Sequence, residues 1–519
     1  MKLTFYGACK TVTGSCYLIE TEDTKLLIDC GMYQGPKELK ERNYRDFLFN
    51  PAEIDYVVLT HAHIDHSGLL PKLMKKGFKG PIITTKATMD LCSIMLPDSG
   101  HIQELEIERK NRKLLRAGKQ ILEPIYDHLD ASKVMLQFKG LDYELVTELS
   151  PTVSIRLQDA GHILGSAIVE MWIKQNEKKI KLVFSGDLGN YNQPIVKDPT
   201  NIDDADYLIM ESTYGNRIHE NKGDKKEILL KIIEETFERG GNLIIPAFAV
   251  ERTQDILYYL GILEQEGRLP DCDIYIDSPL AISASEIFKT SVQYYDEETK
   301  KAYETLGQSP IILKKLKMAR TQEESMRLNE VRGRTIIISA SGMCEAGRIK
   351  HHLKHNLWRP ESSVLFVGFQ AEGTLGRQII EGQKTVKIHG EEIAVKAKIY
   401  NVEGFSAHAD QPALLKWVGS FKKLPRKVFL VHGEIEGIER LKGLLEKNLS
   451  LDVIVPDWQQ SFELAAEKQV STPKKLTDRD LELLYNTVIN KLNQVYKSEI
   501  EKSDLELLYD KLKNIEKAI

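Results

Sequence analysis

The feature that most constrains this chain is a polar cluster that follows a short apolar run directly. Residues 57–60 read Val-Val-Leu-Thr, and residues 61–66 read His-Ala-His-Ile-Asp-His. Four β-favouring residues in a row are typical of a buried strand in an α/β sheet. Ligands of such sheets bind at the carboxyl ends of the strands. We therefore expect the polar cluster to line a site at that edge.

The spacing within the cluster indicates two points of ligation. His61 and His63 are two residues apart, so in extended backbone their side chains point the same way. Asp65 and His66 come at the turn into a helix and can point elsewhere. Imidazole and carboxylate groups without thiolate favour Zn²⁺, with Mn²⁺ or iron as alternatives. A coincidental polar loop is the weaker interpretation, because four candidate ligands occur within six residues.

Later segments deliver side chains of the same kind. A carboxylate at the end of a strand can bridge two cations and partly neutralise them, and a carboxylate behind a ligand can fix a metal-bound imidazole. A histidine between two glycines at a turn can reach a site without a backbone clash. The candidates are Asp29 after a strand within 25–31, His162 in the turn 161–165, Asp187 after 181–184 and Glu211 after 206–210. Their recurrence predicts one shared site.

The middle of the chain follows a different pattern. From residue 225 to about residue 395, helical and strand-like segments alternate, which favours a separate parallel α/β unit. Small-residue loops meet helix starts at Ser341-Gly342 and before Arg377, an arrangement that suits phosphate binding. Three further histidines in this unit are interpreted as packing or phosphate-contacting groups rather than metal ligands: His351, His352 and His355.

The first pattern then returns. A strand-like segment at 397–402 precedes His408, and another at 427–431 precedes His432. We therefore expect the α/β unit to be an insertion and residues 396–460 to complete the first sheet. The tail repeats Asp-Leu-Glu-Leu-Leu-Tyr and predicts a helical hairpin. The predicted domains are 1–208 and 396–460, which form one domain, the insertion 209–395 and the helical tail 461–519.

Composition narrows the class of protein. The net charge is −5, which excludes an indiscriminate polyanion binder, so any nucleic-acid contact requires a local basic groove. No apolar run approaches the roughly 18 residues that span a membrane. Six scattered cysteines without a Cys-x-x-Cys pair are typical of reduced thiols. The expected location is cytoplasmic.

With these motifs in place, the chain resembles the β-CASP family of metallo-β-lactamase-fold hydrolases over about residues 1–460. The resemblance implies an α/β fold in which a four-layer αββα metallo-β-lactamase domain carries an inserted parallel α/β β-CASP domain, here followed by a C-terminal helical hairpin. The matching motifs are HAHIDH at 61–66, His162, Asp187, ESTYGN at 211–216, SASGMCEAGRIKHHL at 339–353, AEGTLGR at 371–377, GFSAHAD at 404–410 and VHGE at 431–434.

The resemblance also implies roles for individual residues. Two Zn²⁺ ions are expected, with Mn²⁺ as the alternative that the donor types allow. The implied ligands are His61, His63 and His162 for one ion, Asp65, His66 and His432 for the other, and Asp187 as the bridge. The implied catalytic residues are Asp65, which also orients water, His408 as proton donor and Glu211 as its support. The implied RNA phosphate-binding residues are Ser341, Gly342, Arg377 and Ser406.

The predicted activity is hydrolysis of RNA phosphodiester bonds, because a histidine at position 432 is similar to RNA-acting members of the family. Internal and 5′-to-3′ cleavage both remain open, and the expected partners are single-stranded RNA and, by resemblance, a second copy of the chain. A DNA nuclease is the nearest alternative. A thioester or lactam hydrolase is less favoured because the insertion would roof a small pocket. A scaffold without activity is disfavoured because every ligand position is filled.

Overall fold

The computed structural model describes residues 1–175, 178–219, 223–368, 370, 373–402, 407–465 and Lys513. The chain forms two compact units, Met1–Ala466 and Glu467–Ile519. The predicted helical hairpin falls within the second unit and, apart from Lys513, lies outside the described residues. Within the described part of the chain, every helix is too short or too polar to cross a lipid bilayer.

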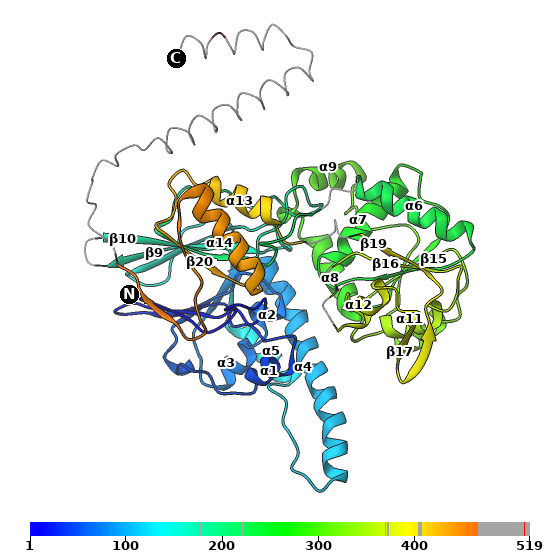
Figure 1. Cartoon of the computed structure of the whole chain (residues 1–519), viewed down its shortest axis with the longest axis horizontal. Helices are drawn as coiled ribbons and strands as arrows, with labels where there is room; N and C mark the ends of the chain where they lie inside the picture. Colours follow the sequence, from blue (N-terminus) through cyan, green and yellow to red (C-terminus); the bar gives the residue numbers. More distant parts are fainter. Residues whose placement is uncertain are drawn as a thin grey trace. The chain divides into compact units, whose positions relative to one another are not determined.

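Two seven-stranded sheets form the base of the first unit (Figure 1). The first has the order β22-β1-β2-β3-β4-β5-β6, and the second has the order β21-β20-β11-β10-β9-β8-β7. The strands of the first sheet are β1 (Lys2–Phe5), β2 (Tyr17–Glu20), β3 (Lys25–Ile28), β4 (Tyr56–Val58), β5 (Ile82–Thr85), β6 (Phe138–Leu141) and β22 (Ser461–Glu463). Those of the second are β7 (Thr147–Glu148), β8 (Val153–Asp159), β9 (Ala167–Gln175), β10 (Lys178–Phe184), β11 (Tyr207–Glu211), β20 (Lys427–Val431) and β21 (Asp452–Ile454).

The sheets pack face to face, and helices cover their outer faces. Because side chains alternate along a strand, Leu26 and Ile28 of β3 pack between the sheets, whereas Leu27 packs under the helices. The helices of the first sheet are α1 (Lys37–Arg42), α2 (Ile64–Ser67), α3 (Leu70–Lys75), α4 (Lys86–Arg116) and α5 (His128–Val134). The second sheet is covered by α13 (Gln411–Gly419) and α14 (Ile435–Leu449). The predicted αββα order is confirmed.

The insertion is built on a six-stranded parallel sheet with the order β14-β13-β15-β12-β16-β19. Its strands are β12 (Leu243–Pro246), β13 (Asp273–Ile276), β14 (Leu316–Met318), β15 (Thr335–Ser339), β16 (Ser363–Phe366) and β19 (Lys398–Asn401). Its helices are α6 (Lys225–Glu238), α7 (Arg252–Gln265), α8 (Pro279–Thr290), α9 (Glu297–Leu306), α10 (Gln322–Leu328), α11 (Ile349–Asn356) and α12 (Leu375–Ile380). A hairpin of β17 (Thr385–Ile388) and β18 (Glu391–Ala394) packs with α11 and α12. The predicted parallel α/β unit is confirmed.

Strand pairing corrects three expectations about where segments belong. The sequence predicts that β19 completes the first domain, but β19 pairs in parallel with β16 at the edge of the inserted sheet. β22 lies in the predicted tail, yet it pairs with β1 because Phe462 packs on Phe5 and Phe429. The predicted boundary after residue 208 cuts β11, which pairs along its whole length with β20. A local pattern shows that a strand is present, whereas packing selects its partner.

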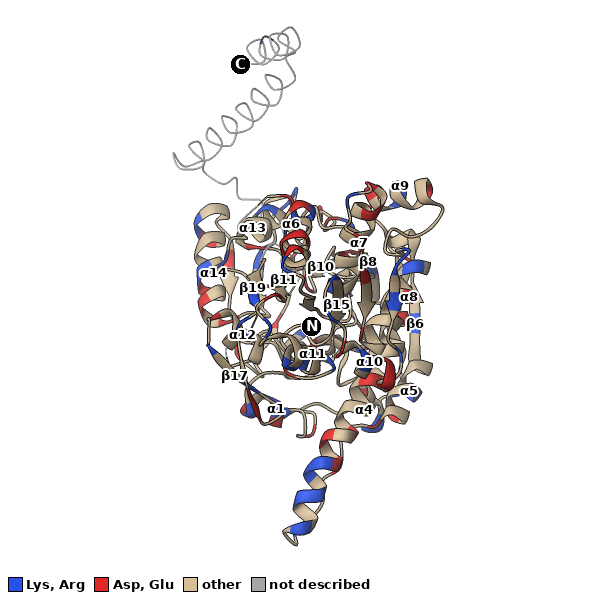
Figure 2. Cartoon of the chain, turned by 90° about the vertical axis from the view of Figure 1, so that its right-hand side faces the viewer, with Lys and Arg blue, Asp and Glu red and all other residues tan. Residues whose placement is uncertain are grey.

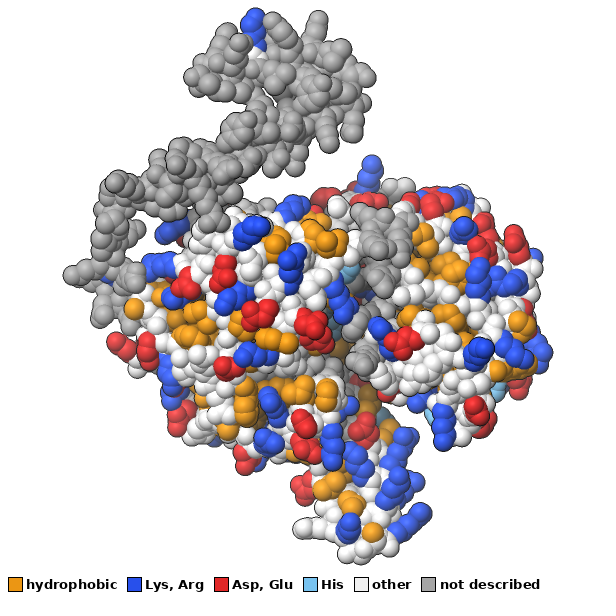
Figure 3. Space-filling view, in the orientation of Figure 1, with side chains coloured by type: hydrophobic (Ala, Val, Ile, Leu, Met, Phe, Trp, Pro, Cys, Tyr) orange, Lys and Arg blue, Asp and Glu red, His pale blue; other side chains and the backbone are white. Residues whose placement is uncertain are grey.

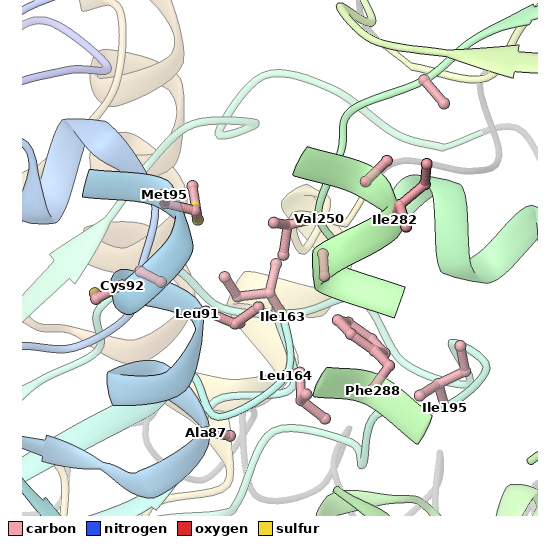
Figure 4. Packing of buried hydrophobic residues seen from close by; sticks show 14 of the residues in the cluster. Ala87, Leu91, Cys92, Met95, Ile163, Leu164, Ile195, Val250, Ile282 and Phe288 are labelled. Atoms are coloured by element: carbon pink, nitrogen blue, oxygen red, sulfur yellow. The ribbon is translucent and has the colours of Figure 1, made fainter. Parts of the chain in front are cut away.

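One hydrophobic core continues from the first domain into the insertion (Figure 4). Leu91 of α4 and Ile163, next to His162, lie with Val250 at the start of the insertion's helical layer. At the same boundary the Glu251 carboxylate accepts the Leu164 backbone N–H at 3.0 Å, and Glu251 has a backbone φ of +70°. The insertion therefore supports the loop that carries His162.

Candidate metal centre

The polar clusters lie at one end of both sheets because the strands that precede them are neighbours. β4 ends at Val58, and two residues separate it from the segment 61–66. In the second sheet β10, β11 and β20 are parallel neighbours, with Phe184 opposite Ile209 and Glu211 opposite Val431. Asp187, Glu211 and His432 therefore leave the same edge of that sheet. The parallel pairing of these strands therefore brings three segments that are distant in the sequence to one site.

The first ligand group consists of His61, His63, His162 and Asp187, whose candidate ligand atoms all lie within 4.8 Å of one another. His63 Nδ1 lies 3.1 Å from His61 Nε2 and 3.2 Å from His162 Nε2. Asp187 Oδ2 lies 3.5 Å from His61 Nε2 and 3.6 Å from His162 Nε2. Three ring nitrogens and one carboxylate oxygen therefore point to one small volume.

The second group consists of Asp65, His66 and His432 and meets the same 4.8 Å limit. His432 Nε2 lies 3.3 Å from His66 Nε2 and 3.4 Å from Asp65 Oδ2. The other oxygen of Asp187, Oδ1, lies 3.3 Å from His66 Nε2. Asp187 thus presents one oxygen to each group. The sequence predicts that the side chains of His61 and His63 point to one site and those of Asp65 and His66 to another. The two groups have this arrangement.

The donor set fits divalent metal ions. Among the described residues, Asp187 Oδ1 is buried and accepts no hydrogen bond, although it faces the second group. Burial lowers the pKa of His61 and of His162 well below the usual value and lowers that of His63 to about 4. These imidazoles are therefore neutral at pH 7, which is the form that ligates zinc. Burial would raise the pKa of Asp187, but His432 and His66 hold it well below its usual value.

Asp29 lies behind the second group. It follows β3, is buried, and receives the Thr60 backbone N–H at 2.8 Å. Its Oδ2 lies 2.7 Å from His66 Nδ1, so that nitrogen donates to Asp29 while Nε2 faces the cluster. A carboxylate that fixes the tautomer of a ligating imidazole raises its basicity. The side chain occupies the position that such a role requires.

His408 and Glu211 form a pair at the rim of the centre. The Glu211 carboxylate lies 3.3 Å from His408 Nδ1, and His408 Nε2 lies 4.0 Å from Asp187 Oδ2. Burial would lower the pKa of His408, but Glu211 and the carboxylates of Asp187 and Asp65 raise it to about 9. The side chains of His408 and Asp65 are 21% and 19% exposed, whereas those of His61 and Asp187 are at most 2% exposed. Solvent therefore reaches the centre on the side of His408 and Asp65.

The structure adds supporting residues that the sequence did not single out. Thr213 Oγ1 lies 3.1 Å from His432 Nδ1. His219 donates its backbone N–H to Asp410 at 3.0 Å, and its Nε2 lies 3.1 Å from the His408 carbonyl oxygen. Thr213 lies two residues after the end of β11 and could have been found by the strand-end pattern. His219 has no sequence signal, because only the fold brings it next to residue 408.

The predicted phosphate-binding loops of the insertion are neighbours, but their polar groups have internal partners. Gly376 donates its N–H to the Met343 carbonyl, and the Leu375 N–H donates to the Glu345 carboxylate at 2.8 Å. Ser341 Oγ accepts the backbone N–H groups of Glu345 and Ala346, and the Gly342 carbonyl accepts from Gln370. Arg377 is exposed and pairs with Glu381 at 2.7 Å. The predicted phosphate contacts of Ser341, Gly342 and Arg377 stay predictions, and Ser406 lies outside the described residues.

Comparison with known proteins identifies the class. Three family models match successive parts of the chain: the metallo-beta-lactamase superfamily at residues 10–120, the Beta-Casp domain at 253–379 and the "Zn-dependent metallo-hydrolase RNA specificity domain" at 392–456. The last model begins before β19 and includes β20 and β21. The models follow the order of the domains along the chain.

Full-length relatives agree with these models. The chain is 38% identical to Ribonuclease TTHA0252 of Thermus thermophilus over 446 residues, which cover 86% of this chain and 96% of that protein. It is 31% identical to Transcription termination factor FttA of Methanosarcina mazei, over 87% of this chain and 70% of that one, and 30% identical to the FttA of Methanocaldococcus jannaschii, over 84% and 67%. The chain therefore belongs to the β-CASP family of metallo-β-lactamase-fold hydrolases.

Proposed function

We propose that this protein is a zinc-dependent ribonuclease that hydrolyses phosphodiester bonds of RNA. The observation that carries the proposal is the meeting of two ligand groups at Asp187 with a carboxylate-supported histidine, His408, at the exposed rim. Family membership and the names of the ribonuclease and termination-factor relatives support an RNA substrate. A substrate can approach the centre on the side of His408, because solvent reaches that side.

We assign one zinc ion to each ligand group. His61, His63 and His162 would hold the first ion, Asp65, His66 and His432 the second, and Asp187 would contact both. Zinc ions held there would supply Lewis acidity and a nucleophile at neutral pH. Asp65 has a partly exposed carboxylate, so it can also orient the attacking water. Asp29 holds His66 in the tautomer that leaves Nε2 free for a metal.

His408 acts as the proton donor in this proposal. Its Nδ1 hydrogen bonds to Glu211, which leaves Nε2 directed toward the centre. The Glu211 carboxylate beside Nδ1 favours the protonated ring, so His408 can protonate the leaving 3′ oxygen. Glu211 in turn accepts the Leu188 backbone N–H, which fixes the carboxylate behind the ring. His219 holds the backbone carbonyl of residue 408 from the other side.

We also propose the two-domain division, with boundaries moved to follow strand pairing. The first domain would contain β1 to β11 and β20 to β22, and the insertion would contain β12 to β19. The insertion packs against the loop that carries His162 and would form one wall of the path for a polynucleotide. An enclosing wall of this size is better suited to a polymer than to a small thioester or lactam.

Three measurements test the proposal on the full chain. Elemental analysis is expected to find two zinc ions per chain, and chelation should abolish cleavage that zinc then restores. RNA labelled separately at each end will show whether cutting is internal, 5′-to-3′ or both. A DNA oligonucleotide of the same sequence is the matched substrate control. Faster cleavage of DNA than of RNA, or cleavage that survives complete metal removal, would refute the proposal.

A further inference from the structure

The chain carries a basic projection that the catalytic centre does not use. The distal part of α4 and the segment that follows it, residues 101–125, extend beyond the rest of the helical layer (Figures 1 and 2), and we call this part the arm. Residues 109–122 contain six cations and no acidic residue, although the whole chain has a net charge of −5. The six are Arg109, Lys110, Arg112, Lys113, Arg116 and Lys119, and all are exposed.

These cations are available to a partner. Among the described residues, Arg112 alone of the six forms an ion pair, with Glu108. The arm has a defined fold, because Asn111 donates to the Leu122 carbonyl at 2.9 Å and accepts the Leu122 N–H at 2.8 Å. Ile107 is buried on that inner side of the helix. The outer side is therefore a fixed surface that presents positive charge to solvent.

The outer cations continue a stripe that starts at the domain boundary. α4 begins beside the loop that carries His162, since Thr85 and Thr88 each donate a hydroxyl to the Gly165 carbonyl, at 2.7 and 2.8 Å. Side chains three or four residues apart share one helix face. One such row is Leu91, Met95, Asp98, Ile102, Leu105, Arg109, Arg112 and Arg116, and Lys113 lies beside it.

The row is buried at its inner end and exposed to solvent at its outer end. Leu91 and Met95 are buried in the core shared with the insertion (Figure 4), whereas Ile102 and Leu105 are 45% and 40% exposed. Figure 3 shows blue Lys and Arg side chains gathered along one edge of the projecting arm. The row therefore leads from the neighbourhood of the metal centre outward to the basic surface.

We propose that the arm is a second RNA-binding surface, which holds the phosphates of a single strand beyond the catalytic centre. The inference rests on the proposed ribonuclease function and extends it to long substrates. Charge complementarity selects this partner, because the six closely spaced cations of 109–122, a stretch without acidic residues, can bind a phosphate chain by releasing counterions. Exposed Ile102 and Leu105 add apolar surface on the same face.

The test uses the full-length protein with Arg109→Gln, Arg112→Gln, Lys113→Gln and Arg116→Gln combined. Glutamine keeps the helix propensity high, so the fold should be retained. The matched control removes four exposed lysines that form no ion pair among the described residues: Lys79→Gln, Lys139→Gln, Lys423→Gln and Lys447→Gln. Binding is measured by fluorescence anisotropy and cleavage by gel, with thermal unfolding as the check on folding.

Two RNAs separate the arm from the centre. One has about 8 nucleotides, within the span of a single binding site, and the other is unstructured and several times longer. For the arm variant, Kd for the long RNA should rise about 10-fold, and the slope of log K against log salt should shrink by about 3 for four lost phosphate contacts. The short RNA should bind and be cut as by the parent protein, and the control variant should behave as the parent does with both.

Three other outcomes would overturn the inference. If the arm variant loses affinity equally for both RNAs, the substitutions act on the catalytic centre or through the overall charge of the protein. If it loses affinity for neither RNA, the arm does not bind RNA. A change of oligomeric state in the arm variant, measured by light scattering, would assign the surface to a second copy instead. If the parent protein cuts neither RNA, the proposed function fails, while the anisotropy comparison still decides whether the arm binds RNA.

Discussion

Both domains place an aspartate at the end of a buried strand and pair it with a histidine, but the two pairs differ in what surrounds them. In the first domain, Asp29 Oδ2 lies 2.7 Å from His66 Nδ1. In the insertion, Asp277 follows β13, and its Oδ2 lies 2.6 Å from His352 Nε2. The His66 Nε2 faces Asp187 and His432, whereas the His352 Nδ1 is buried and, among the described residues, has no hydrogen-bond partner.

The Asp277–His352 pair of the insertion is surrounded by further hydrogen-bond donors to the carboxylate. Asp277 also receives the Ser325 hydroxyl at 2.6 Å and the Arg348 guanidinium at 2.7 Å. These contacts join α10, α11 and β13 inside the insertion, which agrees with the interpretation of His352 as a packing residue. An Asp–His pair therefore does not by itself indicate a metal site. The free nitrogen must also converge with further ligands, which occurs at His66 and not at His352.

The largest expected effect concerns His408. This residue lies near the metal centre that contains the Asp29–His66 pair, and the Asp277–His352 pair has no corresponding residue among those described. His408→Ala removes the proton donor and should slow the chemical step by about 10²–10⁴-fold, while the zinc content stays at the parental level. Single-turnover cleavage and elemental analysis measure the two quantities. His389→Ala, at an exposed histidine of the insertion, is the control. Cleavage by His408→Ala at the parental rate would remove the residue from the mechanism.

The next effect separates structure from chemistry in the insertion. Asp277→Ala leaves Arg348 and His352 without their buried partner and should lower the free energy of unfolding by about 3–5 kcal/mol. Zinc content per folded chain should not change, because Asp277 contacts no member of the ligand groups. Urea denaturation followed by circular dichroism, together with elemental analysis, gives both values. Loss of zinc from the folded variant would contradict the assignment of this pair as structural.

The corresponding change in the first domain should act on the metal instead. Asp29→Ala frees His66 to rotate and to change tautomer, and should weaken zinc affinity by about 10–100-fold. Competition with a coloured chelator measures the affinity directly. If the zinc affinity is unchanged and the loss of stability is as large as that of Asp277→Ala, Asp29 has a structural role like that of Asp277. The distinction between the two Asp–His pairs would then be wrong.

The smallest effect is a pH dependence of the structural pair. Burial would raise the pKa of Asp277, but hydrogen bonds from His352, Ser325 and Arg348 lower it below the usual value of 3.8. The ionised carboxylate therefore stabilises the fold above the usual pKa, and this contribution is lost as pH falls through the lowered pKa. The stability gap between the parent and Asp277→Asn should narrow as pH falls below 3.8. Urea denaturation at a series of pH values measures the gap, and a gap that stays constant through this range would contradict the prediction.

Much of the centre could be predicted because short-range patterns specify it. The apolar run at 57–60 requires a buried strand, and a polar hexad placed directly after it has to lie at the strand's end. The same reasoning found Asp187, Glu211 and His432, because each follows an apolar strand in the chain. Parallel neighbours then align those ends, and the geometry brings the predicted residues into two groups around Asp187.

The sequence alone did not predict which strands pair. It also did not predict which residues support the site from distant parts of the chain. The sequence of β19, Lys-Ile-Tyr-Asn, does not specify a sheet, and only its pairing with β16 places it in the insertion. Glu251 and His219 act on loops far from them in the chain, so no local spacing reveals them. Local hydrophobicity determines that elements form and which side chains end them, whereas long-range packing decides which ends meet.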